Sequence, residues 1–545
     1  MRQLRYTGLV SSLMLFLAAC GGSSGSNAPS PPPSPPAVAA VEAARFLNQA
    51  SFGSTDTESR NVMAMDIDAW IERQMEIPAS LQLPYLQSLP RPQLLLELQG
   101  DRIDIWFRNS IHGPDQLRQR IAFALSQIMV VSQVGALVNQ TYALGSYYDM
   151  LAQNAFANYR DLIEDVTLHP AMGVYLSMLG NEKPDAALNI RPDENYAREL
   201  MQLFSIGLVE LNIDGTPVLD DDGNTVPTYN QEIIEGFAHV YTGWTYAGAP
   251  NFKLAFPNDQ NQTMPMQHYP EFHDGGEKLL LNGVTTLAGQ TGNQDLADAL
   301  DNIFQHPNVG PFIATRLIQR LTTSNPSPGY VRRVAEVFND NGFGVRGDLG
   351  AVVKAILLDD EARPEMRMEI DGKLKEPILR LMQLYRAYNA ASRSGRFGFE
   401  EVSIFFGQGP LQSPSVFNFF SPSYAPPGEI RDSGLVAPEL QIATEYQNTL
   451  VTNYFFIQAF GLNSAATEIA DDDIYIDLSE EIAAAGDAAV LADMVGDKLL
   501  AGQMSAALRA EIIAMVDRIP VADSVARAAE AIFLTSSSPE FAYQR

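Results

Sequence analysis

One segment of the chain concentrates side chains that could do chemistry. Asn195, Arg198, Glu199 and Gln202 recur at i, i+3, i+4 and i+7, so on an α-helix they form a polar stripe beside an apolar one. Glu199 in this stripe could act as a general base or a ligand. Arg198 could bind an anionic or carbonyl group. The stripe therefore supplies candidate catalytic or ligand residues, together with Glu194 just before it.

The same residues also have a structural interpretation, which we favour. Glu194 and Arg198 are spaced i, i+4, as in an ion pair that stabilises a helix by about 0.2–0.5 kcal/mol. Glu199 could fasten two helices by pairing with Arg118 or Arg120. Under this interpretation the stripe holds the fold together and has no catalytic role.

A second group lies in a glycine-containing loop. His273 and Asp274 are adjacent there, with Lys278 as a further charge. Asp274 could orient the imidazole for proton transfer or metal ligation, although lone histidines more often have structural roles. Trp244 could line a pocket, but core packing is the more frequent fate of such a residue.

Motifs for metal or cofactor binding are either absent or lie in segments of the wrong secondary structure or composition. The histidines are scattered, and the sequence lacks paired cysteines and any compact zinc spacing. The glycine pattern at 342–347 follows a helical pattern instead of a strand, which argues against dinucleotide binding. The acidic loop at 220–231 lacks the glycine and glutamate of a calcium loop. We therefore expect no metal and no cofactor.

Helical periodicity dominates the elements that must position these residues. Strand signals concentrate at 207–290, where Asp222-Gly223 is a hairpin-type turn pair. We expect a mainly α protein, a large multi-helix domain with a small β-hairpin insertion around 207–290. The predicted helices are 113–128, 193–206, 308–322, 328–340, 348–359, 374–390, 436–460, 487–500, 504–517 and 521–535.

The amino-terminal residues predict export and lipid attachment. Arg2 and Arg5 precede a short apolar run that is typical of a signal peptide and too short to span a membrane. The run ends in Leu-Ala-Ala before Cys20, the one cysteine of the chain, as in a bacterial lipobox. We expect cleavage after residue 19 and membrane anchoring through lipid on Cys20.

Residues 20–40 form the predicted tether, because they are rich in proline, serine and glycine and can bury little apolar surface. Residues 41–545 show no comparable linker, so we expect a single large helical domain. The formal charge of −29 opposes binding to nucleic acid and to anionic headgroups. These features predict a cell-envelope protein, at the outer membrane, that does not bind nucleic acid.

Several short segments carry a distinctive pattern, above all Glu194–Phe204, with Tyr241–Trp244 and His273–Lys278. Together with the further segments given below, they resemble one uncharacterised bacterial envelope family, the domain of unknown function 1800. The resemblance covers residues 41–545 and implies no agreed activity and no catalytic residues. Members are often exported and encoded beside a second exported family, which implies a protein partner. The segments are Ala44–Gly53, Leu117–Ser132, Glu194–Phe204, Tyr241–Trp244, His273–Lys278, His306–Pro307, Lys375–Pro377, Ser413–Asn418 and Ser538–Phe541.

Two classes of function remain from the sequence. The first is an anchored envelope lipoprotein that is an interaction or assembly partner of another exported protein. The alternative is an envelope hydrolase that uses Glu199 with the His273-Asp274 loop. We favour the first, because the sequence shows no complete catalytic constellation. If the Glu199 and His273 groups met in one pocket, the hydrolase would gain support.

Overall fold

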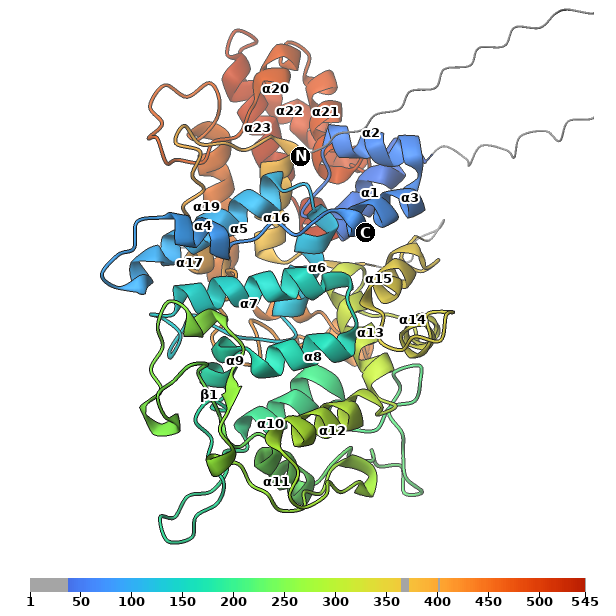
Figure 1. The fold of residues 1–545 in the computed structure, drawn as a ribbon. Helices are drawn as coiled ribbons and strands as arrows, with labels where there is room; N and C mark the ends of the chain where they lie inside the picture. The colour runs from blue at the N-terminus through green and yellow to red at the C-terminus, as the bar shows by residue number, and fades with distance from the viewer. Residues whose placement is uncertain (1–37, 364–371, 400–401, 545) are drawn as a thin grey trace, which may run out of the picture. The chain divides into compact units, whose positions relative to one another are not determined.

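The computed structural model describes residues 38–363, 372–399 and 402–544, which are mainly helical (Figure 1). This confirms the predicted fold class. Ala37–Arg545 form one compact unit. In the described part of the chain no helix is long and apolar enough to cross a membrane.

The first half of the unit is built from twelve helices in chain order. Short 3-10 turns join several of them, η1 (Leu95–Leu98), η2 (Asn154–Phe156), η4 (Phe252–Leu254), η5 (Asn261–Thr263), η6 (Pro270–Phe272) and η7 (Leu281–Gly283). The helices are α1 (Ala40–Ala50), α2 (Asp56–Met65), α3 (Ile67–Glu76), α4 (Leu83–Ser88), α5 (Gln99–His112), α6 (Gln116–Ser126), α7 (Thr141–Gln153), α8 (Tyr159–Leu168), α9 (Pro170–Tyr175), α10 (Asn195–Glu199), α11 (Gln231–Val240) and α12 (Gly292–Phe304).

The described residues of the second half form twelve more α-helices. Those predicted from periodicity begin and end within a few residues of the expected bounds, except the helix expected at 436–460. Its first residues form η8 (Pro438–Gln441) and a loop instead. The twelve helices are α13 (Val309–Leu321), α14 (Pro328–Asn339), α15 (Leu349–Leu358), α16 (Pro377–Ala387), α17 (Val402–Phe406), α18 (Glu429–Asp432), α19 (Glu445–Phe460), α20 (Ser479–Ala484), α21 (Ala488–Leu500), α22 (Ala506–Val516), α23 (Ser524–Ser536) and α24 (Pro539–Ala542).

Capping side chains set several of these helix starts. Asp348 accepts the Ala351 N–H at the start of α15, and Ser327 accepts the Tyr330 N–H at the start of α14. Such caps satisfy N–H groups that have no partner within the helix. His169 caps α9 in the same way, through its ring nitrogen.

The predicted β insertion is present but weakly paired. The chain turns at the left-handed Gly223, where Leu219 and Thr225 form an isolated bridge. Leu211–Pro217 and Val209–Pro227 are further isolated bridges, in place of a continuous ladder. Proline has no N–H to donate, so a ladder is interrupted where it falls.

The described chain has two two-residue ladders, one inside the 207–290 insertion and one outside it. Strand β1 (Trp244–Thr245) pairs with β2 (Gln267–His268), and β3 (Lys373–Leu374) pairs with β4 (Tyr543–Gln544), both antiparallel. The second pair joins the last described residues to the segment that leads into α16.

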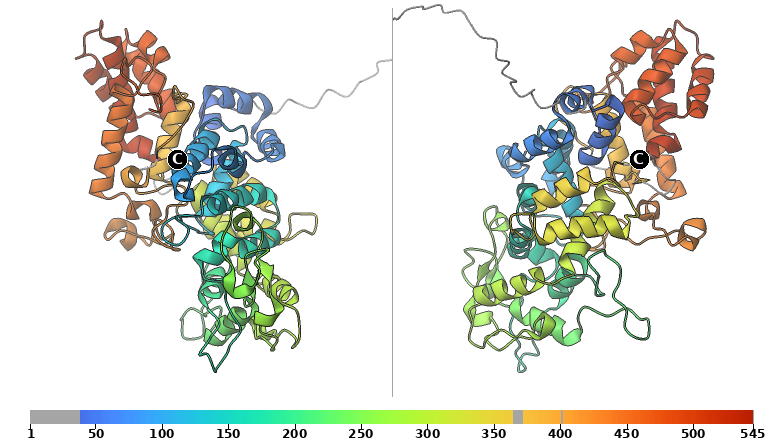
Figure 2. Two further views of the ribbon diagram at one scale, coloured as in Figure 1. Left: turned by 60° about the vertical axis from the view of Figure 1, so that its left-hand side comes forward. Right: turned by 90° about the vertical axis from the view of Figure 1, so that its right-hand side faces the viewer.

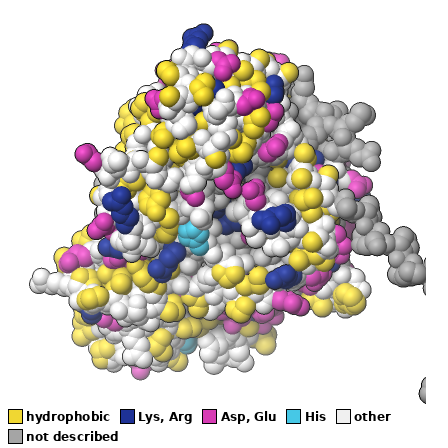
Figure 3. All heavy atoms as spheres, turned by 90° about the horizontal axis from the view of Figure 1, so that it is seen from above, with side chains coloured by type: hydrophobic (Ala, Val, Ile, Leu, Met, Phe, Trp, Pro, Cys, Tyr) yellow, Lys and Arg dark blue, Asp and Glu magenta, His cyan; other side chains and the backbone are white. Residues whose placement is uncertain are grey.

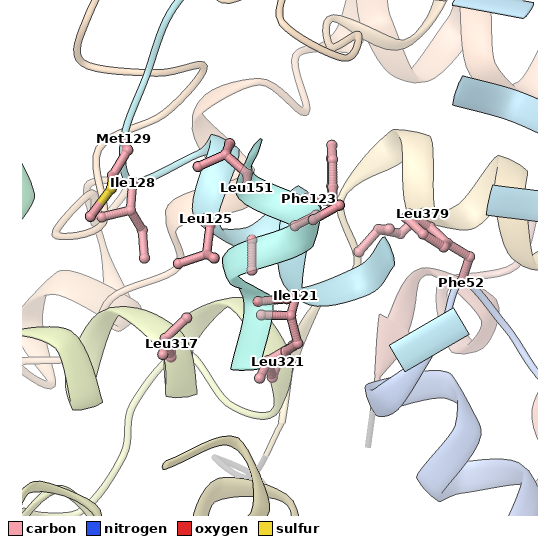
Figure 4. Close-up of a cluster of buried hydrophobic side chains, with 14 of the residues drawn as sticks. Phe52, Ile121, Phe123, Leu125, Ile128, Met129, Leu151, Leu317, Leu321 and Leu379 are labelled. Carbon is pink, nitrogen blue, oxygen red and sulfur yellow. The ribbon is translucent and has the colours of Figure 1, made fainter. Parts of the chain in front are cut away.

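A continuous apolar core connects the helices. Ile121 and Leu125 of α6 face Leu317 and Leu321 of α13, with Leu151 of α7 beside them (Figure 4). In Figures 1 and 2, α20–α23 lie together at one end of the ribbon and α10–α12 at the other, with α6, α7 and α13 between them. Acidic, basic and apolar side chains are intermixed on the face drawn in Figure 3.

Candidate functional site: an arginine-lined cleft

The signature segment is not one α-helix. The α-helix α10 ends at Glu199, and residues Leu200–Ser205 continue as the π-helix η3. The Ser205 hydroxyl donates to the Leu200 carbonyl at 2.6 Å, and the Ile206 N–H donates to the Met201 carbonyl. The wider turn breaks the α-helical spacing that the polar stripe assumed. π-turns of this kind are frequent at functional sites.

The stripe residues also have different surroundings. Glu194 and Arg198 form the expected i, i+4 ion pair at 3.0 Å, and Gln231 of α11 donates to Glu194 at 2.9 Å. Asn195 is exposed. These contacts hold α10 against α11 at the surface.

Glu199 is buried instead, with 6% of its surface exposed. Its carboxylate forms no hydrogen bond with a described residue, and one of its oxygens, Oε2, is fully buried. Burial raises the pKa of Glu199, while the Arg198 charge opposes the rise. Tyr175 and Tyr229 lie close enough for the Glu199 charge to add to the increase that burial causes in their own pKa values.

The expected ion pair between Glu199 and Arg118 or Arg120 is wrong. Arg118 donates to the carbonyls of Met75 at 2.9 Å and Ala152 at 3.1 Å. Arg120 donates to the carbonyl of Arg320 at 2.5 Å. Backbone carbonyls near helix ends compete for these arginines, and sequence spacing does not reveal them.

His273 is not oriented by its neighbour Asp274. Its Nε2 lies 2.9 Å from Asp295 on α12, and the Lys278 ammonium lies 2.6 Å from the same carboxylate oxygen. Burial raises the pKa of Asp295, but the contacts with His273 and Lys278 outweigh it, so the net pKa is lowered. The expected His273–Asp274 pair is wrong, because the backbone sends the two side chains in different directions.

Asp274 pairs with His239 on α11. That hydrogen bond is the main reason why the pKa of Asp274 falls to about 2. Both carboxylates therefore fasten the 267–290 loops to neighbouring helices. Among the described residues no group of three or more His, Cys, Asp or Glu could hold a metal ion.

Trp244 is a core residue, with 3% of its surface exposed. Its ring lies 5.0 Å from that of His268, between centroids. This position agrees with packing, the role that we favoured. Cys20 lies outside the described residues.

One cavity is lined by the residue types of a hydrolase catalytic triad. It measures about 330 Å³ and brings Ser146, His169 and Asp149 together. However, His169 Nδ1 accepts the Ala171 N–H, so its proton sits on Nε2, which faces the Ser146 hydroxyl at 3.1 Å. Ser146 in turn donates to the Ala143 carbonyl. The histidine has no free lone pair for Ser146 and does not activate it.

The strongest candidate is a cleft of about 400 Å³ beside the π-helix. Its walls come from segments far apart in the chain, the end of α6, η3 and the loop after it, α13, and the loop at 416–423. Its lining residues are Gln127, Ile128, Gln202, Leu203, Gly207, Leu208, Phe312, Arg316, Arg320, Val416, Phe417, Asn418, Phe420, Ser421, Pro422 and Ser423. Ile128 belongs to the buried cluster of Figure 4, so the wall is continuous with the core.

Two arginines one turn apart on α13 give the cleft its charge. Arg316 stacks on Phe312 at 4.9 Å, and Arg320 stacks on Phe420 at 4.6 Å. Burial, together with the weaker effect of the Arg320 charge, lowers the pKa of Arg316 to about 10. Both guanidinium groups remain cationic at neutral pH.

Amide side chains complete the polar lining. Gln127 donates to Glu376 at 2.8 Å and accepts from Asn418 at 3.2 Å. Asn418 has a left-handed backbone, φ +66°, which asparagine tolerates better than most residues. Gln202 reaches the cleft from η3 and forms no hydrogen bond with a described residue.

Buried charges support the cleft from behind. Glu376 lies 3.9 Å from both Arg320 and Lys373, and Lys373 forms a 2.9 Å ion pair with Glu439. Burial raises the pKa of Glu376, but these cations and Arg120 outweigh it and lower the net value. The Glu376 carboxylate therefore stays ionised next to the cleft.

We did not predict the arginines from the sequence. Arg316 and Arg320 are spaced i, i+4 on the predicted helix 308–322, with Phe312 one turn before them. Two cations in register on an apolar helix of a strongly acidic chain are a usable signal. Their proximity to Gln202 and Asn418 arises only in the tertiary structure, so the spacing of residues in the sequence does not predict it.

Comparison with known proteins identifies a family. A family model described as "Protein of unknown function (DUF1800)" matches residues 45–543. No curated protein and no solved structure matches the chain.

Proposed function

The chain belongs to the DUF1800 family, and on that premise we propose that it is an exported, lipid-anchored envelope protein that binds another exported protein through the arginine-lined cleft. The proposed anchor is lipid on Cys20, which follows the apolar run and Leu-Ala-Ala. The proposed tether, residues 20–40, would carry the folded unit away from the membrane. The outer membrane is the proposed location.

One observation carries the binding role. The cleft combines two guanidinium groups that lack a close carboxylate partner with exposed apolar side chains at its rim. Phe417, at the rim, is 58% exposed. Aromatic and arginine side chains around a concave site are the composition of protein-binding hot spots. The residues that line it include no His, Asp, Glu, Lys or Cys, so Ser421 and Ser423 have no general base among them.

Site-specific photo-crosslinking tests this role. A photoreactive phenylalanine analogue at Phe417 of the lipoprotein, expressed in its native envelope, should form one dominant crosslink to an exported protein. Arg316→Gln should abolish that crosslink, because it removes a charge from the cleft. Arg518→Gln is the matched control, since Arg518 is exposed and forms no ion pair with a described residue. A crosslink that survives Arg316→Gln at full yield contradicts the proposal.

The hydrolase alternative now depends on Glu199. Its buried, unpartnered carboxylate with a raised pKa is the kind of group that can transfer protons near neutral pH. His273 and Asp274 no longer support it, because each pairs with another residue. Glu199 would act as the general acid or base of such a reaction.

A further inference from the structure

The charges around the cleft do not balance. Four cationic side chains, Arg120, Arg316, Arg320 and Lys373, gather at or behind it, and the carboxylates that act on them are Glu376 and Glu439. Arg316 forms no ion pair with a described residue. A surplus of buried positive charge is costly unless an anion compensates it.

The guanidinium groups also have unused donors. Arg320 is 5% exposed, yet its side chain forms no hydrogen bond with a described residue, and its Glu376 contact is long at 3.9 Å. Arg316 donates to Gln319 alone, at 3.2 Å. Both guanidinium groups stack on aromatic rings through their faces, so the N–H groups at their edges remain free to form bidentate hydrogen bonds with a planar anion.

The rest of the cleft fits a peptide better than an inorganic anion. The Gln202 amide can donate to and accept from a peptide backbone, since its donors and acceptor have no hydrogen-bond partner among the described residues. Phe312, Phe417 and Leu208 provide apolar surface for side chains. The volume of about 400 Å³ lies within the range of pockets that enclose small ligands.

From these contacts we infer that the cleft captures the free C-terminal carboxylate of an extended segment of the exported partner. The inference rests on the proposed function and specifies its ligand. The carboxylate lies between Arg316 and Arg320, the last backbone amides meet Gln202, and an apolar side chain packs on the aromatic rim. Recognition of a chain end by its carboxylate is an established mode of peptide binding.

Two peptide pools test the inference on the full-length lipoprotein purified in detergent and immobilised. One randomised, N-acetylated tetrapeptide pool ends in a free carboxylate, and the other is identical but ends in a carboxamide. The wild-type protein should retain the free-acid pool about tenfold more strongly, as counted by mass spectrometry. Arg316→Gln should remove this preference, Arg316→Lys should retain part of it, and Arg518→Gln should leave it unchanged.

The outcomes separate the inference from the proposed function. Equal retention of acid and amide pools overturns the inference, and so does an acid preference that survives Arg316→Gln. If inorganic phosphate displaces the peptides while carboxylates such as acetate do not, the site recognises phosphate and the inference also fails. In each of these cases an Arg316-dependent crosslink from Phe417 would leave the proposed function standing, whereas its loss would remove both.

Discussion

Asp295 contacts two buried side chains at once, although it lies on a helix that the sequence did not connect with them. His273 and Lys278 both contact one oxygen of its carboxylate, and all three side chains are at most 4% exposed. A buried carboxylate in this position is structurally indispensable, because its removal leaves the Lys278 ammonium without an anionic partner and the His273 ring without its carboxylate partner. The contacts with Asp295 of α12 thus stabilise the conformation of the loop that carries the family motif His273–Lys278.

Asp295→Asn should lower the free energy of unfolding by roughly 3 kcal/mol, since it leaves the buried Lys278 ammonium without a carboxylate partner. Lys278→Met in the same chain should recover part of the loss, which a double-mutant cycle by urea denaturation measures. Asp298→Asn, at an exposed position of α12, is the control. Because the pKa of Asp295 is lowered in the folded state, its contribution is complete above the ordinary value of 3.8 and disappears as the pH falls through the folded value. A stable Asp295→Asn variant would refute this role.

Glu199→Gln should leave the free energy of unfolding unchanged or raise it by about 1 kcal/mol, because no cation is left unpaired and a buried charge disappears. The pKa of Glu199 is raised, so wild type should lose stability relative to the variant as the pH rises from 4.5 through the folded value. Denaturation at acidic and neutral pH measures the difference, with the exposed Glu511→Gln as control. A large destabilisation would show that Glu199 has a structural partner.

The same variant separates the two functions. If Glu199→Gln remains folded and still forms the Phe417 crosslink, yet loses the phenotype of a gene deletion, the hydrolase gains support over the binding role. If the phenotype persists, Glu199 has no catalytic part.

The π-helix η3 is the element that turns the signature segment into one wall of the cleft. An α-helix through the same residues would carry Gln202 in the same stripe as Asn195 and Arg198, on the surface that faces α11. The additional residue in the π-turn changes the direction of every side chain after Glu199. The turn has its own internal support in the hydrogen bond from Ser205 to the carbonyl of Leu200.

Ser205→Ala should weaken this turn. The substitution leaves the buried Leu200 carbonyl without the side-chain donor, at a cost of about 1 kcal/mol. Hydrogen exchange of the amides in 200–206 should accelerate, while those of α13 stay protected. Ser537→Ala is the control, because that hydroxyl is buried without a hydrogen-bond partner among the described residues. Unchanged exchange in 200–206 would show that the turn depends on packing alone.

At the scale of the whole molecule, anchoring and folding should be separable. Cys20→Ser should abolish incorporation of labelled fatty acid and release the protein from membranes, because the thiol that would carry the lipid is gone. Its unfolding curve should match that of wild type, since Ala37–Arg545 form a compact unit of their own. Persistent membrane partitioning after a high-salt wash would contradict the lipoprotein assignment.

The sequence by itself determined the features that depend on local spacing. Helices such as α13, α14 and α21 have the predicted bounds, because an amphipathic face recurs every three to four residues and capping residues mark its ends. The ion pair between Glu194 and Arg198 followed from the same spacing. Family membership followed from short motifs distributed along the chain.

The tertiary structure decided which distant residues meet. His273 contacts Asp295 and not the expected Asp274. Arg118 and Arg120 donate to backbone carbonyls and not to the expected Glu199. The cleft joins residues from 127 to 423 in one site. Such contacts depend on how helices pack and on where a π-turn redirects a side chain, and neither is encoded in the periodicity of a single segment.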